Sequence, residues 1–477
     1  PKPPRPTPMP RLLLLGIALL CAAPAHAQTP ADTSAVVGTW QGALSIGQDS
    51  LRIVFEIERS GDSLSATMDS PDQGATGIPV PNVLVTADTL RLGVPSIAGA
   101  FAGVVKEQGT RTVVDGQWVQ GPTRLPLTLR KTDAAPEVRR PQTPEPPFPY
   151  RSDSVSFRND DAGITLAGTL TRPAEEAADG SVPAVVIVGG SGPQDRNGTI
   201  QGHEPFHVLA DHLTRQDVAV LRYDERGVGA SEGTLRGATS RDLAGDVQAA
   251  VAFLSEQPGI DASRVGIVGH SEGGVIAPMV ATETDQVDFL VLLAAPGLPG
   301  RQILADQLED IGESRGMDRR ALAVQRGTQQ RLFEALEREA DSAEIATELK
   351  QIMRDTRGIS GEEAIEQEVR RLMSPWFRFF VSYDPRPALR QVDVPVLALT
   401  GSNDLQVAAD TNLAAIDDAL ESGQNPPHTV RAVDGLNHLL QPSETGAVSE
   451  YGRIETTLAP RVLEEITAWI RDQSPER

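Results

Sequence analysis

Two kinds of hydrophobic pattern divide this chain. Between residues 36 and 131, apolar and polar positions alternate in short stretches, for example at residues 54–58 and 82–86, and turn-forming residues separate the stretches. Such alternation is typical of strands with one buried face, and no helical period appears in this part. The pattern predicts a small antiparallel barrel or sandwich, with Trp40 filling its core.

From residue 151 onwards, the hydrophobic positions form continuous runs instead. Several apolar residues in a row, bounded by glycine or polar residues, are typical of strands buried on both faces. Helical patterns at residues 205–215 and 242–255 lie between such runs. Strands that alternate with helices predict a mostly parallel sheet covered by helices on both faces. The buried strands are predicted at residues 184–188, 218–223, 265–268, 289–293, 396–400 and 429–433.

Composition sets the boundaries between these parts. Residues 132–150 are rich in proline and are predicted to form a stiff linker. The linker separates an all-β domain at residues 36–131 from an α/β domain at residues 151–473. Residues 297–385 interrupt the α/β domain with charged helical patterns, which predict a helical cap inserted after a strand.

The N-terminus is predicted to be a targeting segment. Arg11 precedes an apolar run at residues 12–20, and residues 25–27 (Ala-His-Ala) fit a signal-peptidase cleavage site. Residues 1–27 are therefore expected to be a signal peptide, with a short extension upstream of Met9. The mature protein is expected to be exported to the periplasm or outside the cell, without an integral membrane segment.

Charge removes one class of partner. The formal net charge is −22, which argues against binding to nucleic acid, because phosphate backbones attract basic surfaces. Hydrophobic residues make up 39% of the chain, enough for a globular core. We therefore expect a small-molecule partner; the sequence does not indicate the oligomeric state.

One turn carries the strongest chemical signal. The predicted strand at residues 265–268 runs into Gly269-His270-Ser271-Glu272-Gly273, which has the spacing G-x-S-x-G. In this nucleophile elbow a sharp strand-to-helix turn exposes a serine hydroxyl at the edge of a sheet. The glycines leave room for the strained backbone of the serine. Ser271 is therefore the candidate nucleophile.

A serine nucleophile needs a base, and the base needs an acid that fixes its tautomer. Asp404 follows the predicted strand at 396–400, and His438 follows the one at 429–433. The chain order Ser271, Asp404, His438 is the order of the α/β-hydrolase triad. Asp410 is the alternative acid, although it lies further from its strand in a helix-like stretch.

Backbone N–H groups are expected to complete the site as an oxyanion hole. One is that of Glu272, directly after the nucleophile, while its side chain is expected at the surface or in a salt bridge. The second is that of Ser191 or Gly192, in the glycine-rich loop after the strand at 184–188. Asp224 and Arg226 follow the strand at 218–223 and are predicted to brace the neighbouring loops through an arginine–carboxylate pair.

One competing motif is present. His203-Glu204-Pro205-Phe206-His207 matches the zinc-protease pattern H-E-x-x-H. That chemistry requires both histidines on one face of a continuous helix, and proline is tolerated only in the first turn of a helix. The helix is therefore predicted to begin at Pro205, with His203 in the preceding loop, and we expect neither a metal nor an organic cofactor.

Four segments together resemble the α/β-hydrolase superfamily, and in particular bacterial EstD-type esterases and serine aminopeptidase-like hydrolases. The resemblance covers about residues 155–473 and implies an α/β-hydrolase fold with a helical cap, preceded here by a small all-β barrel-like domain. It also implies hydrolysis of carboxylic esters without a cofactor. The segments are residues 190–195, 223–229, 269–274 and 436–438.

The expected function is therefore a serine carboxylic ester hydrolase that acts through an acyl-enzyme. Two alternatives stay open. The same triad could cleave peptides as an aminopeptidase-like enzyme, for which the acidic cap could bind a free N-terminus. The protein could also be a non-catalytic lipid or glycan binder, although the intact triad argues against this. An aromatic cluster at residues 376–380, together with Tyr383, is expected to line the acyl pocket or to form the core of the cap.

Overall fold

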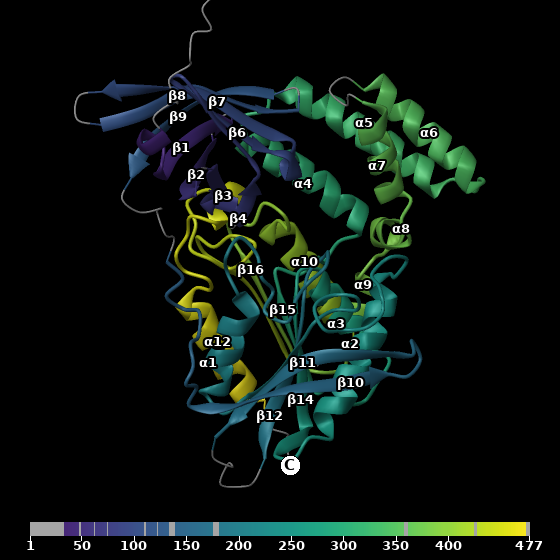
Figure 1. Cartoon of the computed structure of the whole chain (residues 1–477). Coiled ribbons are helices and arrows are strands. Elements are labelled where there is room, and N and C mark those ends of the chain that lie inside the picture. Colours follow the sequence, from purple (N-terminus) through teal and green to yellow (C-terminus); the bar gives the residue numbers. More distant parts are fainter. Residues whose placement is uncertain are drawn as a thin grey trace, which may run out of the picture.

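The structure is a computed structural model that describes residues 33–46, 49–61, 63–73, 75–108, 111–121, 123–132, 139–174, 181–356, 361–423 and 427–473. The predicted signal peptide and residues 133–138 of the predicted linker lie outside the described residues. A β domain and a group of cap helices lie at the same end of a larger α/β domain (Figure 1).

In the described part of the N-terminal domain, nine antiparallel strands form one sheet in the order β4-β3-β2-β1-β9-β8-β7-β6-β5. The sheet is nearly closed, because β3 contacts β5 and β4 contacts β6. Trp40 is fully buried in its core and donates a hydrogen bond of 2.7 Å from Nε1 to the carbonyl of Val36. Three short 3-10 helices complete the domain: η1 (Thr33–Ala35), η2 (Pro71–Gln73) and η3 (Pro95–Ile97). The strands are β1 (Gly38–Ile46), β2 (Asp49–Ser60), β3 (Ser63–Ser70), β4 (Ala75–Val80), β5 (Asn82–Thr86), β6 (Thr89–Val94), β7 (Gly99–Gln108), β8 (Arg111–Gln120) and β9 (Thr123–Thr132).

The α/β domain is built on a mixed sheet with the order β10-β11-β13-β12-β14-β15-β16-β17. β10 and β11 are antiparallel to their neighbours, and the pairs from β13 through β17 are parallel. The carboxyl ends of the parallel strands therefore meet at one edge. The strands are β10 (Tyr150–Asn159), β11 (Ile164–Pro173), β12 (Val182–Val188), β13 (Ala219–Tyr223), β14 (Ile260–His270), β15 (Phe289–Leu293), β16 (Val396–Gly401) and β17 (His428–Val433).

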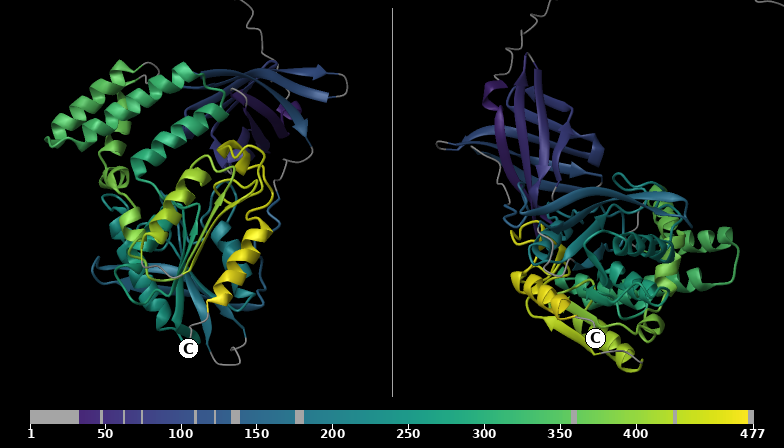
Figure 2. Two further views of the ribbon diagram at one scale, coloured as in Figure 1. Left: turned by 180° about the vertical axis from the view of Figure 1, so that it is seen from behind. Right: turned by 90° about the horizontal axis from the view of Figure 1, so that it is seen from below.

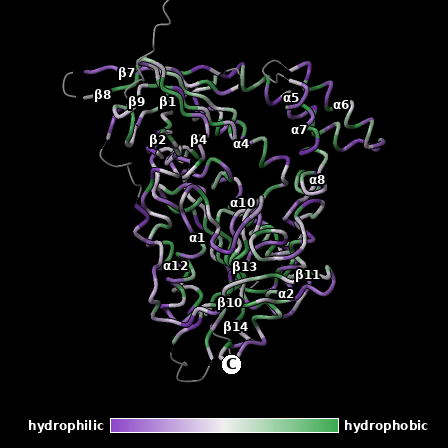
Figure 3. The backbone as a smooth tube through the Cα atoms, in the orientation of Figure 1, coloured by the Kyte–Doolittle hydropathy of each residue, from purple (hydrophilic) through white to green (hydrophobic). Residues whose placement is uncertain are grey.

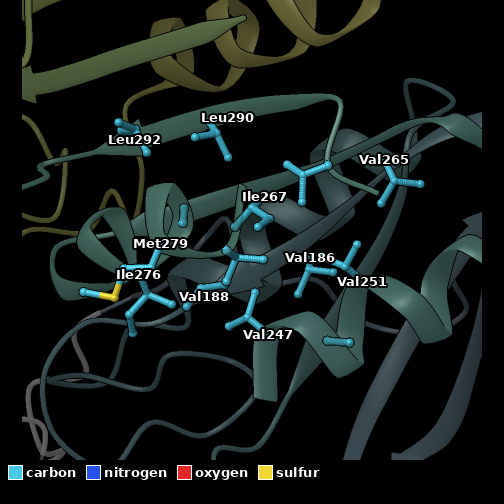
Figure 4. Packing of buried hydrophobic residues seen from close by; sticks show 14 of the residues in the cluster. Val186, Val188, Val247, Val251, Val265, Ile267, Ile276, Met279, Leu290 and Leu292 are labelled. Atoms are coloured by element: carbon cyan, nitrogen blue, oxygen red, sulfur yellow. The ribbon is translucent and has the colours of Figure 1, made fainter. Parts of the chain in front are cut away.

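Helices cover both faces of this sheet, as its continuous apolar strands require. α1 (Pro205–Thr214) and α12 (Pro460–Asp472) pack on one face. On the other face, Val247 and Ile276 belong to one cluster with Ile267 and Leu290 of the strands (Figure 4). Colouring by hydropathy shows the same layering, with apolar strands at the centre (Figure 3). The helices of this second face are α2 (Ser240–Ser255), α3 (Glu272–Ala281), α9 (Arg386–Leu389) and α10 (Ala409–Glu421).

The helices of the cap follow β15 and have a hydrophobic core of their own, which includes Leu349, Met353 and Phe377. α4 and α8 touch closely, because a Cβ at Gly300 would lie 1.9 Å from the carbonyl oxygen of Phe380. Within the described residues, neither these helices nor any others combine the length and the apolar character that a bilayer span requires. The cap helices are α4 (Gly300–Ser314), α5 (Arg319–Glu337), α6 (Ser342–Asp355), α7 (Glu362–Leu372) and α8 (Pro375–Ser382).

The β domain rests on a loop that follows β17 and contains the short helix α11 (Val448–Tyr451). A Cβ at Gly452 would lie 2.3 Å from the carbonyl oxygen of Asp72 in η2, so the two backbones are in direct contact. The buried carboxylate of Asp72 pairs with Arg52 of its own domain at 2.6 Å and lies 3.9 Å from Arg453. Both views of Figure 2 show the β domain beside this end of the α/β domain.

Candidate active site

Ser271 lies at the turn between β14 and α3 with φ of 54°, a strained backbone conformation for a residue with a side chain. Two glycines allow the turn. A Cβ at Gly269 would lie 2.2 Å from the carbonyl oxygen of Gly273, and a Cβ at Gly273 would lie 2.4 Å from that of Val188. The elbow therefore packs against the end of β12, where only glycine leaves enough space.

Asp404 and His438 meet at the carboxyl edge of the sheet. Nδ1 of His438 lies 2.8 Å from Oδ2 of Asp404, and both side chains are buried. Oδ1 of Asp404 accepts hydrogen bonds from the backbone N–H groups of Gln406 (2.8 Å) and Val407 (2.9 Å). The aspartate is thus fixed from both oxygens. Asp410 is exposed in the first turn of α10, so the alternative acid is not the partner of the histidine.

One cavity of about 290 Å³ brings Ser271 and His438 together with both predicted oxyanion residues, Ser191 and Glu272. The glycine-rich loop touches the elbow, because a Cβ at Gly190 would lie 3.1 Å from that of Ser271. Of the two candidates in the loop, Ser191 lines the cavity, whereas Gly192 does not. Among the described residues, the backbone N–H groups of Ser191 and Glu272 have no hydrogen-bond acceptor. Two free donors thus border the cavity next to the serine, as an oxyanion hole requires.

His270, directly before the serine, is a supporting residue that the sequence analysis missed. Its Nε2 lies 2.9 Å from the carbonyl oxygen of His438. Burial, together with the neighbouring His438, lowers the pKa of His270 to about 4, so the ring is neutral near pH 7. A neutral ring that donates from Nε2 holds the backbone of His438, and this contact between distant positions becomes visible only in the folded structure.

Arginine–carboxylate pairs brace the loops near the site, as predicted. Asp224 and Arg226 belong to two separate pairs, however, each with a partner from another segment. Asp224 is bound by Arg196, with Nη2 2.6 Å and Nε 3.0 Å from its two oxygens. Arg226 instead binds Asp246 of α2 through two contacts of 2.6 and 2.8 Å. The loops after β12 and β13 are therefore fixed to each other by partly buried, charge-assisted hydrogen bonds and to α2 by buried ones.

The expectation for the side chain of Glu272 was wrong. It is 2% exposed, and its Oε1 accepts hydrogen bonds from Ser240 Oγ (2.5 Å) and from Trp376 Nε1 (2.8 Å). A carboxylate at the first turn of α3 is favoured by the helix dipole, which offsets part of the cost of burial. The sequence showed the motif but not the two donors, which are 32 and 104 positions away.

The aromatic cluster divides between the cavity and the cores. Trp376 and Phe380 line the cavity and stack at 5.4 Å. Phe377 belongs to the core of the cap, and Phe379 and Tyr383 pack against the core of the α/β domain. Helical spacing explains the division, because positions four apart share one face of α8.

The H-E-x-x-H residues are placed as predicted, with α1 beginning at Pro205 and His203 before it. His203 is fully buried, and its ring nitrogens lie 2.9 Å from Thr457 Oγ1 and from the carbonyl oxygen of Tyr451. Burial lowers its pKa to about 4. His207 pairs instead with Glu204 at 2.8 Å. Both ring nitrogens of His203 are thus engaged in holding the loop under the β domain.

Glu225 provides a test of buried charge. Its carboxylate lies under the glycine-rich loop and accepts a hydrogen bond of 3.1 Å from the N–H of Gln194. Burial, reinforced by the charges of Glu272 and Asp246, raises the pKa of Glu225 from 4.5 to about 8. Between these two values the unfolded chain releases a proton that the folded protein keeps, so Glu225 lowers stability as the pH rises through this window.

We expect the Glu225→Gln variant to lose less stability than the wild type between about pH 5 and about pH 8, by up to roughly 1.4 kcal/mol per pH unit. Glutamine keeps the acceptor for Gln194 and cannot ionise. Thermal unfolding followed by circular dichroism at both pH values measures the difference. Parallel pH profiles for the two proteins would contradict the assignment.

Comparison with known proteins gives two similarities in sequence. A family model described as serine aminopeptidase, S33, matches residues 197–350, a segment that contains Ser271 but ends before Asp404. Esterase EstD of Thermotoga maritima is 27% identical over 325 residues, which span 68% of this chain and 70% of EstD.

Solved structures that are similar include a Pyrococcus furiosus esterase, Pf2001, with a TM-score of 0.40 and 14% identity, covering 68% of this chain and 93% of that one. Est1E of Butyrivibrio proteoclasticus, solved with bound ferulic acid, has a TM-score of 0.38 and 16% identity, covering 67% of this chain and 96% of that one. The mixed sheet with helices on both faces and the elbow between β14 and α3 form the arrangement of an α/β-hydrolase fold. In sequence, the chain resembles the EstD-type esterases and serine aminopeptidase-like hydrolases.

Proposed function

We propose that this protein is a serine carboxylic ester hydrolase that works through an acyl-enzyme. The observation that carries the proposal is the buried His438–Asp404 pair, whose histidine borders the same cavity as a serine held in a strained elbow. The name of the similar esterase EstD supports the ester as the substrate class. The cavity is mostly apolar, with Ile303, Leu304 and Phe380 among its lining residues, which suits an uncharged acyl group.

In the proposed mechanism, Nε2 of His438 takes the proton of Ser271 as the hydroxyl oxygen attacks the ester carbonyl. Asp404 holds Nδ1 and stabilises the imidazolium. The N–H groups of Glu272 and Ser191 donate to the oxyanion. The tetrahedral intermediate then expels the alcohol, which receives the proton from His438. Water repeats the sequence on the acyl-enzyme and releases the acid, so every group in the reaction comes from this chain, the substrate or water.

The test is a series of p-nitrophenyl esters from acetate to palmitate. We expect hydrolysis with an optimum at short or medium acyl chains, because a cavity of about 290 Å³ is at the small end of the range for ligand sites. A matched series of aminoacyl p-nitroanilides tests the aminopeptidase alternative, which the matching family model favours. Turnover of the anilides with no ester hydrolysis would replace the proposal. No turnover of either, with no labelling by a fluorophosphonate, would favour the binding protein.

We also propose that the protein is exported, to the periplasm or outside the cell, on the basis of the predicted signal peptide at residues 1–27. Fractionation of cells that express the full chain would test this, with cytoplasmic retention of the intact N-terminus as the contrary result.

A further inference from the structure

A single oxygen atom joins three parts of the molecule. Oε1 of Glu272 accepts from Ser240 at the start of α2 and from Trp376 in the cap helix α8. Glu272 itself is the first residue of α3 and contributes a free backbone N–H to the cavity. The elbow, the helix that covers the sheet and the cap are thus connected at the residue next to the nucleophile.

The surroundings of Glu272 require its partner in the cap to be a hydrogen-bond donor. Its carboxylate is buried, and Glu225, also buried, is close enough for the charge of Glu272 to raise its pKa. A buried carboxylate requires donors to replace water. Two side chains, Ser240 and Trp376, donate hydrogen bonds to this carboxylate. The indole N–H of Trp376 can only donate a hydrogen bond and cannot accept one.

Trp376 in turn positions a wall of the cavity. Its ring stacks on Phe380 with an interplanar angle of 14°, and both rings line the cavity. The next residue, Phe377, is buried in the core of the cap, and Trp376 also packs against that core. The hydrogen bond to Glu272 therefore links this aromatic wall to the residue next to Ser271.

We propose that Glu272 is a positioning residue that, through Trp376, sets the cap-side wall of the cavity and so determines which acyl chains the enzyme accepts. This inference rests on the proposed ester hydrolysis. Shorter acyl groups need little of the wall, whereas longer ones pack against the two stacked rings. Loss of the hydrogen bond lets the wall move and changes selectivity more than it changes the chemical step.

The first test compares kcat/KM for p-nitrophenyl octanoate with that for the acetate. Trp376→Phe removes the N–H and keeps an aromatic ring, and we expect the octanoate-to-acetate ratio to fall about tenfold, mainly through KM, as loss of a hydrogen bond to a charged group implies. Glu272→Gln keeps an oxygen that accepts from Trp376, so its octanoate-to-acetate ratio should stay within about twofold of that of the wild type. Trp469→Phe in α12, away from the cavity, is the matched control. An unchanged ratio in Trp376→Phe overturns the proposal.

The second test uses Glu272→Ala alone and combined with Trp376→Phe. If the two residues act through one hydrogen bond, the double variant has the ratio of the single variants, whereas multiplied effects would show independent roles and overturn the proposal. Hydrogen exchange of residues 375–382 gives a readout without substrate, and we expect it to be about tenfold faster in Trp376→Phe, with α12 unchanged. If the wild type hydrolyses no ester but exchange in α8 is faster in Trp376→Phe, the proposed function fails, while the role of the Glu272–Trp376 hydrogen bond in holding α8 remains supported. If exchange in α8 is the same in Trp376→Phe as in the wild type, that positioning role is overturned.

Discussion

Replacement of Ser271 by alanine is expected to reduce kcat for ester hydrolysis by about five to six orders of magnitude. The variant removes the atom through which the protein forms its covalent bond to the acyl group, and the oxyanion donors and the histidine cannot replace it. The fold should be retained, because alanine is smaller and the strained turn is held by its neighbours, with the N–H of Ser271 bonded to Leu293 at 2.9 Å.

Ser263→Ala is the matched control, because Ser263 is exposed at the opposite end of the same strand, β14. Both variants are compared with the wild type in two assays: the rate of p-nitrophenyl butyrate hydrolysis and the rate of labelling by a fluorophosphonate. Labelling of Ser271→Ala at the rate of the wild type would mean that another residue is the nucleophile.

The second large effect is expected for Asp404→Asn, with kcat reduced about ten-thousandfold near neutral pH. Asparagine fits the space of Asp404 and can still accept at Oδ1, where the N–H groups of Gln406 and Val407 bind. Its amide then presents a donor to Nδ1 of His438, which favours the wrong tautomer and gives no charge to stabilise the imidazolium.

Asp410→Asn separates the two acids that the sequence left open. Asp410 is exposed in α10 and has no bond to His438 in the structure, so this variant should keep its activity within about twofold. Steady-state kinetics across pH would show the effect of Asp404→Asn. A larger loss in Asp410→Asn than in Asp404→Asn would reverse the assignment.

The elements that position the proposed triad could be predicted because their patterns are local. Continuous apolar runs identified β12, β13, β15 and β16 almost to the residue, and the glycine spacing placed Ser271 at the end of β14. Each of these patterns depends on a few neighbouring positions, and the burial and backbone geometry that produce it act in the same way in the folded protein. The triad order followed from the ends of these strands.

Contacts between distant segments could not be predicted in this way. Whether Asp224 pairs with Arg226 or Arg196 depends on how two loops cross, and the sequence offers both as neighbours of a carboxylate. The burial of Glu272 depends on a tryptophan in the cap, and an acidic residue is ordinarily expected at the surface. The sequence could nevertheless have raised one question: a tryptophan in a charged cap needs a partner for its N–H.

The contact between the two domains also has a consequence for how this chain can change over evolutionary time. Gly452 cannot acquire a side chain unless η2 retreats, because Asp72 occupies the space of its Cβ. Tyr451, beside it, is bonded through its hydroxyl to Gln406, whose N–H binds Asp404. A substitution on the surface of the β domain that faces this loop can therefore affect Tyr451 and Gln406, and through them Asp404. The two domains are therefore expected to be inherited as a pair, and exchange of the β domain by recombination would disturb residues next to Asp404, the proposed catalytic acid.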